Sequence, residues 1–214
     1  DPKDDNKLAG IELLNNADVA LISVRRRGLP PEQMAGIRRF VESGKPVVGL
    51  RTASHAFSLR NKPIPEGYVD WAEFDQQVFG GNYQNHHGNG PQVQISVAPQ
   101  AERQPHPILQ DVDVKSLIGY GSLDRVQPLA DTTTPLLIGT VPGKESEPIL
   151  WTNRPATGNR VVYTSLGHVK EFEQPAFQQL LKNALLWTAR VESRGSRARQ
   201  KAKQRRSVLT TESL

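Results

Sequence analysis

A short apolar segment that ends abruptly in a polar turn is the feature that most limits how this chain can fold. Residues 46–50 read Pro-Val-Val-Gly-Leu, and residues 51–55 read Arg-Thr-Ala-Ser-His. A near-continuous apolar run of this length is typical of a parallel strand buried on both faces of a sheet. Polar side chains that follow such a strand lie at its carboxyl end, where open α/β sheets bind ligands. The segment predicts an α/β fold with Arg51 and His55 as candidate site residues.

A complete β–α–β unit surrounds this segment. Residues 18–24 form a second apolar run, and Pro30 and Pro31 favour the start of a helix that Gly44 ends. The helix carries one apolar stripe, which consists of Met34, Ile37, Phe40 and Val41. We expect the strands at 18–24 and 46–50 to lie parallel, joined by a right-handed crossover.

The rest of the chain continues the alternation of strands and helices. We expect helices at 71–79 and from Pro175 to Trp187, and strands at 92–98, 123–129, 135–141, 149–153 and 160–166. Residues 80–90, rich in glycine, asparagine and histidine, predict a loop. The expected fold is an open, mostly parallel sheet with helices on both faces, formed by residues 1–189.

The positive charge of the chain is concentrated at its C-terminal end. The formal net charge is +5, but residues 190–214 hold eight basic and two acidic side chains, so residues 1–189 are close to neutral. This tail lacks apolar periodicity, which predicts disorder. A solvated terminus and a non-specific contact with RNA or anionic lipid both fit it. The folded part shows no nucleic-acid signature.

Several function classes are excluded or disfavoured by missing features. The chain has no cysteine, so it has neither a thiolate nucleophile nor a cysteine-ligated metal. It has no apolar stretch long enough to span a membrane, no Walker-type glycine loop and no G-x-S-x-G motif. The histidines lack a compact metal-binding pair, and we expect no metal and no other cofactor.

Polar residues also follow a second predicted strand, 160–166, which ends at Gly167 and His168. If the two strands are neighbours, Arg51, His55, His168 and Glu171 converge on one crevice at the carboxyl edge of the sheet. The loop from Asn82 to Asn89, which includes Tyr83 and His87, would form a third wall. Imidazoles near neutrality suit acid–base work or the binding of hydroxylated ligands.

Simpler roles for the same residues remain open at this point. Arg51 suits a structural pair with a buried carboxylate. His55 suits a hydrogen bond at a helix start. His86 and His87 are adjacent, so at most one of them faces the crevice if the loop is extended.

The chain resembles the ThuA-like family, named for trehalose utilisation, within the class I glutamine amidotransferase-like superfamily. The resemblance rests on residues 44–57, the loop at 80–87, His106-Pro107-Ile108, residues 162–168 and the segment from Phe172 to Trp187. It implies a flavodoxin-like sheet. The family normally has a strand, a helix and a strand ahead of Asp18, so the resemblance also implies that the chain lacks these elements.

The resemblance assigns roles to three residues. It places Arg51 where true amidotransferases have their cysteine nucleophile, His168 near the catalytic histidine and Glu171 near its acidic partner. A guanidinium stays protonated and cannot attack an amide, so glutaminase activity is excluded.

The function that follows from these expectations is carbohydrate metabolism, with binding or conversion of a keto-disaccharide or related sugar. The catalytic candidates are His55, His168 and Glu171; the ligand-binding candidates are Arg51, Asn82, Tyr83, His87 and Tyr120. Asparagine amides suit sugar hydroxyls, and tyrosines suit the apolar face of a ring. The alternative is a non-catalytic module that binds a sugar or a protein. A homo-oligomer is compatible with the sequence, which leaves localisation open.

Overall fold

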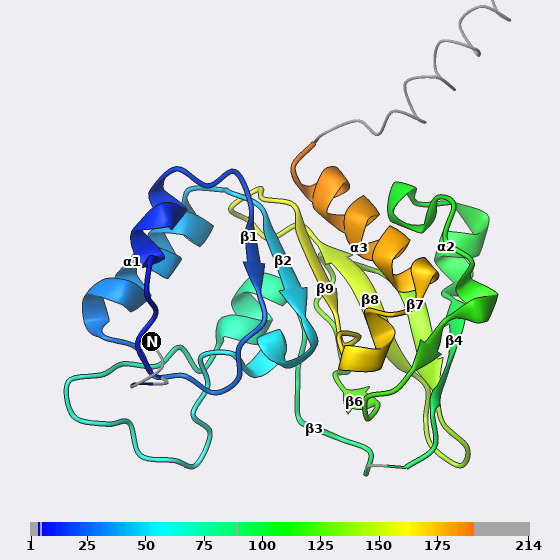
Figure 1. Cartoon of the computed structure of the whole chain (residues 1–214), viewed down its shortest axis with the longest axis horizontal. Coiled ribbons are helices and arrows are strands. Elements are labelled where there is room, and N and C mark those ends of the chain that lie inside the picture. Colours follow the sequence, from blue (N-terminus) through cyan, green and yellow to red (C-terminus); the bar gives the residue numbers. More distant parts are fainter. Residues whose placement is uncertain (1–3, 5, 89, 191–214) are drawn as a thin grey trace, which may run out of the picture.

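The computed structural model describes residues 4, 6–88 and 90–190. Its centre is a seven-stranded sheet in the order β1-β2-β9-β8-β7-β4-β5 (Figure 1). The strands are β1 (Ala20–Ile22), β2 (Val47–Leu50), β4 (Val93–Val97), β5 (Ile118–Gly119), β7 (Thr133–Thr140), β8 (Glu147–Asn153) and β9 (Val161–Thr164). A separate two-stranded sheet pairs β3 (Asn85–His86) with β6 (Asp124–Arg125).

Helices and helical turns connect these strands. The α-helices are α1 (Pro31–Glu42), α2 (Pro99–Arg103) and α3 (Pro175–Thr188). The shorter turns are η1 (Ile11–Asn15), η2 (Arg51–His55), η3 (Asp75–Phe79), η4 (Pro107–Leu109), η5 (Val114–Ser116) and η6 (Val169–Glu171). None of the helices in the described ranges has the length and apolar character needed to cross a membrane.

The expectation of a mostly parallel sheet is wrong. Only the β1–β2 and β2–β9 pairs are parallel among the described strands, while β8–β9, β7–β8, β4–β7 and β4–β5 are antiparallel. The cause lies in β8, which is buried along its whole length although both of its neighbours run antiparallel to it. A fully buried antiparallel strand has the same apolar run as a parallel one, so composition does not separate them.

The expected strands agree with the structure where the chain is most apolar. The predicted segments 18–24, 46–50 and 160–166 contain β1, β2 and β9, and β2 pairs with β9 in parallel from Val47–Val161 to Leu50–Thr164. The two polar turns therefore do leave neighbouring strands at the same edge. The predicted strand at 123–129 is reduced to β6, and the helix predicted at 71–79 forms only the π-helical turn η3.

Helices cover both faces of the sheet, with α1 and α3 on opposite sides (Figure 1). Val47 and Val161 face the cluster that includes the apolar stripe of α1. Val48 and Val162, the next residues along the same strands, face the cluster that includes Phe177, Leu180 and Ala184 of α3. Alternation along β2 and β9 thus builds two cores, one on each face.

The η3 turn packs closely on β2 because β2 contains a glycine. A Cβ atom on Gly49 would lie 2.4 Å from Cζ of Phe79, so any side chain there would meet the aromatic ring. Phe79 itself is fully buried against Tyr163, with ring centroids 5.1 Å apart. This contact holds Asp75, at the start of η3, beside the carboxyl end of β2.

One of the two edge strands of the sheet is β5, and a glutamine side chain lies along it. The Gln174 amide accepts the backbone N–H of Ile118 at 2.9 Å and donates to its carbonyl oxygen at 2.8 Å. Gln174 immediately precedes α3, so this pair of bonds ties the start of α3 to β5.

Candidate functional site: a cavity between two helical turns

The turn after β2 is held in an unusual backbone conformation. Arg51 has a φ of 51°, a left-handed value that non-glycine residues seldom adopt. The hydroxyl of buried Tyr163 donates to the Arg51 carbonyl oxygen at 2.6 Å and so stabilises this conformation. Gly167, with φ of 134°, leaves room for the Arg51 Cβ, which would lie 3.3 Å from a Cβ at position 167.

The Arg51 side chain extends towards the loop that follows β5. A Cβ on Gly121 would lie 3.9 Å from Nη1 of Arg51. Burial raises the pKa of Asp124 to about 7, and the nearby Arg51 charge partly opposes the shift. The Arg51 charge thus favours the ionised form of the half-buried Asp124. This effect agrees with the structural role for Arg51 that the sequence left open, a pair with a buried carboxylate.

Glu171 is buried, and its carboxylate is surrounded by backbone donors. One oxygen accepts the N–H groups of Tyr120 at 2.6 Å and Gly121 at 3.3 Å. The other accepts those of Gly167 and His168, the latter at 2.8 Å. Four donors satisfy both oxygens, so this carboxylate fixes the turn after β9 against the loop after β5.

His168 begins the η6 turn and is partly exposed. Its Nδ1 accepts the backbone N–H of Lys170 at 3.2 Å, and with Glu171 it completes a capping box. The imidazole lies 6.1 Å from the Tyr120 ring, centroid to centroid. The structure thus brings Arg51, Tyr120, His168 and Glu171 together in one group at the carboxyl ends of β2 and β9.

The other predicted residues line a separate cavity of about 130 Å³ between η2 and η3. Its lining comprises Arg26, Ser54, His55, Ser58, Arg60, Ala72, Asp75, Gln76, Asn82 and Tyr83. His55, Asn82 and Tyr83 were expected here; the two arginines, the two serines and Asp75 were not. Nearly all of the lining side chains are polar, so the cavity suits a small polar ligand.

His55 is buried and carries no charge at neutral pH. Its Nδ1 lies 3.1 Å from Oγ of Ser54, and its ring stacks on Tyr83 with centroids 4.2 Å apart. Burial lowers the pKa of His55 to about 3, and the charges of Arg26, Arg25 and Arg60 add to the shift. A neutral imidazole of this kind donates or accepts a hydrogen bond but does not carry protons near pH 7.

Asp75 is the residue in the cavity whose titration falls near neutrality. It is 6% exposed, and burial raises its pKa to about 7 although its Oδ2 accepts the Tyr83 N–H at 2.7 Å. Its Oδ1 is buried and has no hydrogen-bond partner among the described residues. A signal in the sequence was the Gly80-Gly81 pair: a Cβ on Gly81 would lie 2.7 Å from that Oδ1.

His87 does not line this cavity. Its backbone N–H donates to the Leu123 carbonyl at 2.8 Å, which places it beside β6, and its Nε2 is buried without a partner within the described part of the chain. His86 is exposed, with Nδ1 2.9 Å from the His87 carbonyl oxygen. Neither imidazole of the pair reaches the cavity.

One side chain links the cavity to the Arg51 group. The Tyr163 hydroxyl that donates to the Arg51 carbonyl also lies near the side chain of Ser54, which neighbours His55. The carboxyl end of β2 therefore separates two adjacent groups of polar residues, and the single crevice expected from the sequence is divided in two.

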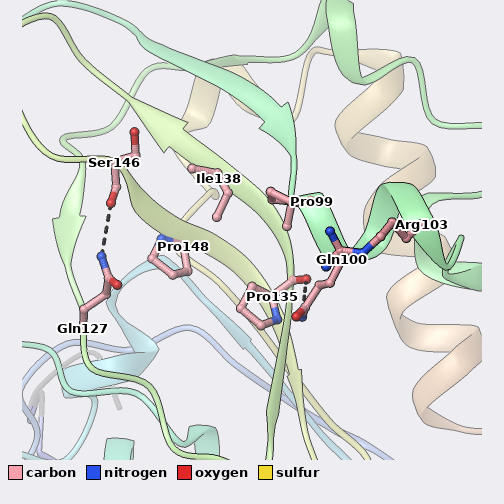
Figure 2. A pocket seen from close by; sticks show the side chains of 9 residues that line it. Pro99, Gln100, Arg103, Gln127, Pro135, Ile138, Ser146 and Pro148 are labelled. Carbon is pink, nitrogen blue, oxygen red and sulfur yellow. Dashed lines mark hydrogen bonds between the residues drawn. The ribbon is translucent and has the colours of Figure 1, made fainter.

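A larger cavity, of about 350 Å³, lies away from these residues, on the antiparallel half of the sheet. Figure 2 shows Pro99, Pro135, Ile138 and Pro148 along it. Two of its polar side chains already donate hydrogen bonds to the backbone: Gln127 to the Ser146 carbonyl at 3.2 Å and Gln100 to the Pro135 carbonyl at 3.1 Å. The only titratable side chain of its lining is the exposed Arg103, whereas the smaller cavity holds buried His55 and Asp75, so we regard the smaller cavity as the functional candidate.

The described residues contain no group of three or more histidine or acidic side chains arranged to hold a metal ion. The basic tail assigned to residues 190–214 lies, apart from Arg190, outside the described residues.

Comparison with known proteins gives a family and a fold. The sequence profile of the ThuA family, described as trehalose utilisation, matches residues 2–188. A comparison with curated proteins finds no match.

Three solved structures illustrate the likeness in fold. A ThuA-like protein from Bacteroides uniformis shares 19% identity at a TM-score of 0.62, covering 83% of this chain and 71% of that one. A ThuA-like protein from Parabacteroides merdae shares 16% identity at a TM-score of 0.57, and the match covers 82% of this chain and 71% of that one. The cytoplasmic protein STM3548 from Salmonella typhimurium shares 14% identity at a TM-score of 0.52, and the match covers 84% of this chain and 74% of that one. At these identities the likeness concerns the fold alone.

Proposed function

Because the chain belongs to the ThuA family, described as trehalose utilisation, we propose that it acts in carbohydrate metabolism by binding and converting a sugar in the cavity between η2 and η3. The observation that carries the proposal is the unpartnered Oδ1 of Asp75. A buried carboxyl oxygen without a partner is costly unless a ligand supplies one. A sugar hydroxyl or carbonyl is such a group.

The size of the cavity limits how much of a sugar it can hold. Its volume of about 130 Å³ is below the roughly 300 Å³ at which ligand pockets usually begin. We therefore place one end of the substrate, rather than a whole disaccharide, inside it. Ser54, Ser58 and Asn82 provide hydroxyl and amide groups for hydrogen bonds to that end.

The chemistry follows from two side chains with displaced pKa values. Asp75, with a pKa of about 7, exists in both forms near neutrality and can accept and return a proton. For a keto-sugar, its carboxylate takes the proton from the carbon next to the carbonyl, and the freed electron pair moves to the carbonyl oxygen to give an enediolate. The hydroxyl proton of the deprotonated carbon passes to the former carbonyl oxygen, and Asp75 returns its proton to the former carbonyl carbon, so the carbonyl has moved by one carbon and the product is an isomer.

Neutral His55 suits stabilisation of the enediolate oxygen. In the tautomer whose Nδ1 accepts the Ser54 hydroxyl proton, Nε2 carries hydrogen and can donate it in a hydrogen bond. A neutral imidazole whose pKa is lowered by its surroundings is a known electrophile in sugar isomerisation. His168 and Glu171, expected as catalytic residues, lie in the neighbouring group and take no part in this step.

Hydrogen exchange into the sugar tests the proposal. The chain is incubated in deuterium oxide with trehalose, keto-disaccharides and simple hexoses, while melting temperature and deuterium incorporation are followed. We expect one class to stabilise the chain and to exchange next to its carbonyl. Asp75→Asn should slow exchange by about 100-fold or more.

The matched control is Glu73→Gln, which changes an exposed carboxylate two residues away and should leave exchange unchanged. Equal exchange in Asp75→Asn and the unaltered chain would show that Asp75 is not the base. No response to any sugar would overturn the proposal as a whole.

A second candidate is a non-catalytic module on the same fold. It is favoured by Arg51 at the position where the superfamily resemblance expects a thiol, and by Glu171, whose oxygens are already taken by backbone donors. Stabilisation by a sugar without any exchange or conversion would support this candidate over the enzyme.

A further inference from the structure

We propose that the cavity between η2 and η3 recognises a permanently anionic oxygen group of its ligand, a carboxylate or a phosphate, through Arg26 and Arg60. This inference rests on the proposed function, because it names the class of sugar that enters the same cavity: an acidic sugar derivative rather than a neutral one. The cation expected from the sequence, Arg51, is not among the lining residues.

Arg26 is held in place by its surroundings. Its φ is 52°, its backbone N–H donates to the His55 carbonyl at 3.0 Å, and its Nη1 donates to the Ser58 carbonyl at 3.1 Å. The guanidinium is partly buried and lies near the Tyr83 side chain. A guanidinium fixed at its base and directed along a cavity wall is preorganised for an oxyanion.

Arg60 lies in the segment that follows η2, two residues beyond Ser58, to which Arg26 donates. Its backbone is also left-handed, with φ of 59°, and its Nη2 donates to the Gln84 carbonyl. This bond joins Arg60 to the loop that carries Asn82 and Tyr83. Two residues with strained backbones thus bring their guanidinium groups to one cavity, and such strain is concentrated at binding and catalytic sites.

The structure describes no carboxylate that neutralises the positive charge of this pair. No carboxylate within the described ranges forms an ion pair with Arg26 or Arg60. Burial lowers the pKa of Arg26, and the Arg60 charge adds to the shift. The same charges, with that of Arg25, lower the pKa of His55. Arg26 is partly buried and Arg60 is exposed, and like charges held near one another destabilise one another, so a bound anion lowers that cost.

Neutral donors complete the site. Ser54 and Ser58 line the cavity beside the arginines, and hydroxyl groups commonly share an oxyanion with guanidinium groups. Asp75 is the one acidic residue of the lining, so the anionic group of a ligand meets a single carboxylate there beside the two guanidinium groups. An acidic sugar can therefore place its anionic group by the arginines and its carbonyl by Asp75.

Matched probes test this by calorimetry on the full chain: glucose, glucuronate, glucose 6-phosphate and inorganic phosphate. We expect at least one acidic sugar to bind at least about tenfold more tightly than glucose. Arg60→Gln and Arg26→Lys should each remove most of that difference. Arg125→Gln is the control, because it removes an exposed guanidinium that also bonds Gln84 but does not line the cavity.

The outcomes separate this inference from the proposed function. Equal affinity for glucose and both acidic sugars, or full retention of the difference in Arg60→Gln and Arg26→Lys, would overturn the anion site and leave sugar binding in place. Inorganic phosphate binding as tightly as the acidic sugars would support the anion site and overturn the sugar function. Circular dichroism of each variant confirms that it is folded.

Discussion

The Glu171 carboxylate accepts the backbone N–H of Tyr120 at 2.6 Å, although the two residues are 51 positions apart in the sequence. The same carboxylate accepts the N–H groups of Gly121, Gly167 and His168. One buried charge therefore organises the backbone of two loops that meet beside the ends of β2 and β9. Its primary task in the structure is positioning.

We predict that Glu171→Gln destabilises the fold by about 2 kcal/mol, because a neutral amide replaces an acceptor of charge-assisted hydrogen bonds and turns a donor towards backbone donors. Urea unfolding measures the change. The exposed neighbour variant Glu173→Gln should stay within about 0.5 kcal/mol of the unaltered chain. Loss of sugar conversion at unchanged stability would instead support the catalytic role inferred from the resemblance.

Gly49→Ala should destabilise the chain by about 2 kcal/mol or more, because the new methyl group would overlap the Phe79 ring in a packed core. Replacing Phe79 by Leu in the same chain should recover part of the loss. Gly36→Ala, in the interior of α1 with its nearest neighbours at 3.9 Å, is a control of opposite sign. It should stabilise by about 0.5–1 kcal/mol. Similar thermal denaturation curves for both alanine variants would contradict the close packing of η3 on β2.

The raised pKa of Asp75 makes the effect of Asp75→Asn on stability depend on pH. Asp75 has a pKa of about 7 in the folded chain against 3.8 as a free side chain, so between these values the folded state holds a proton that the unfolded state has lost. The contribution of Asp75 to stability therefore falls as pH rises from about 4 to about 7 and is constant above that.

The Asp75→Asn variant lacks this pH-dependent contribution. The stability of the variant relative to the unaltered chain should therefore rise as pH increases from about 4 to about 7. The difference in unfolding free energy between the variant and the unaltered chain isolates the effect of Asp75, because His55 is present in both. The lowered pKa of His55 has the opposite effect on stability: the contribution of His55 is lost as pH falls below about 6.5. Urea unfolding at several pH values from 4 to 8 measures the difference. A difference that does not change with pH would show that Asp75 titrates normally.

The sequence predicted the parallel part of the sheet because its strands are apolar along their whole length. Residues 46–50 and 160–166 contain β2 and β9, which are neighbours as expected. The antiparallel part was missed because β8 is equally buried. A signal was present in the Pro142-Gly143 dipeptide between β7 and β8, where Gly143 has a φ of 72°.

The sequence predicted where Arg51 and His55 lie relative to a strand but not the direction of their side chains. Arg51 and His55 follow β2 as expected, but they face different groups of residues. Asp75 was missed because it falls in a segment interpreted as an ordinary helix, and its burial depends on Gly81 and Tyr83, which approach only in the folded chain. Arg26 had a local signal that was not used, because the arginines at 25–27 directly follow the predicted strand at 18–24. Arg60 had none, since exposed arginines are common.

The Gln174 amide that pairs with both backbone groups of Ile118 has a consequence for self-association. Exposed strand edges recruit strands of other molecules through their free N–H and C=O groups. On β5, the Gln174 side chain forms hydrogen bonds with both the N–H and the C=O group of Ile118, as a neighbouring strand would do. Another copy of the chain would have to displace this amide before it could extend the sheet, so β5 resists the edge-to-edge pairing that starts aggregation.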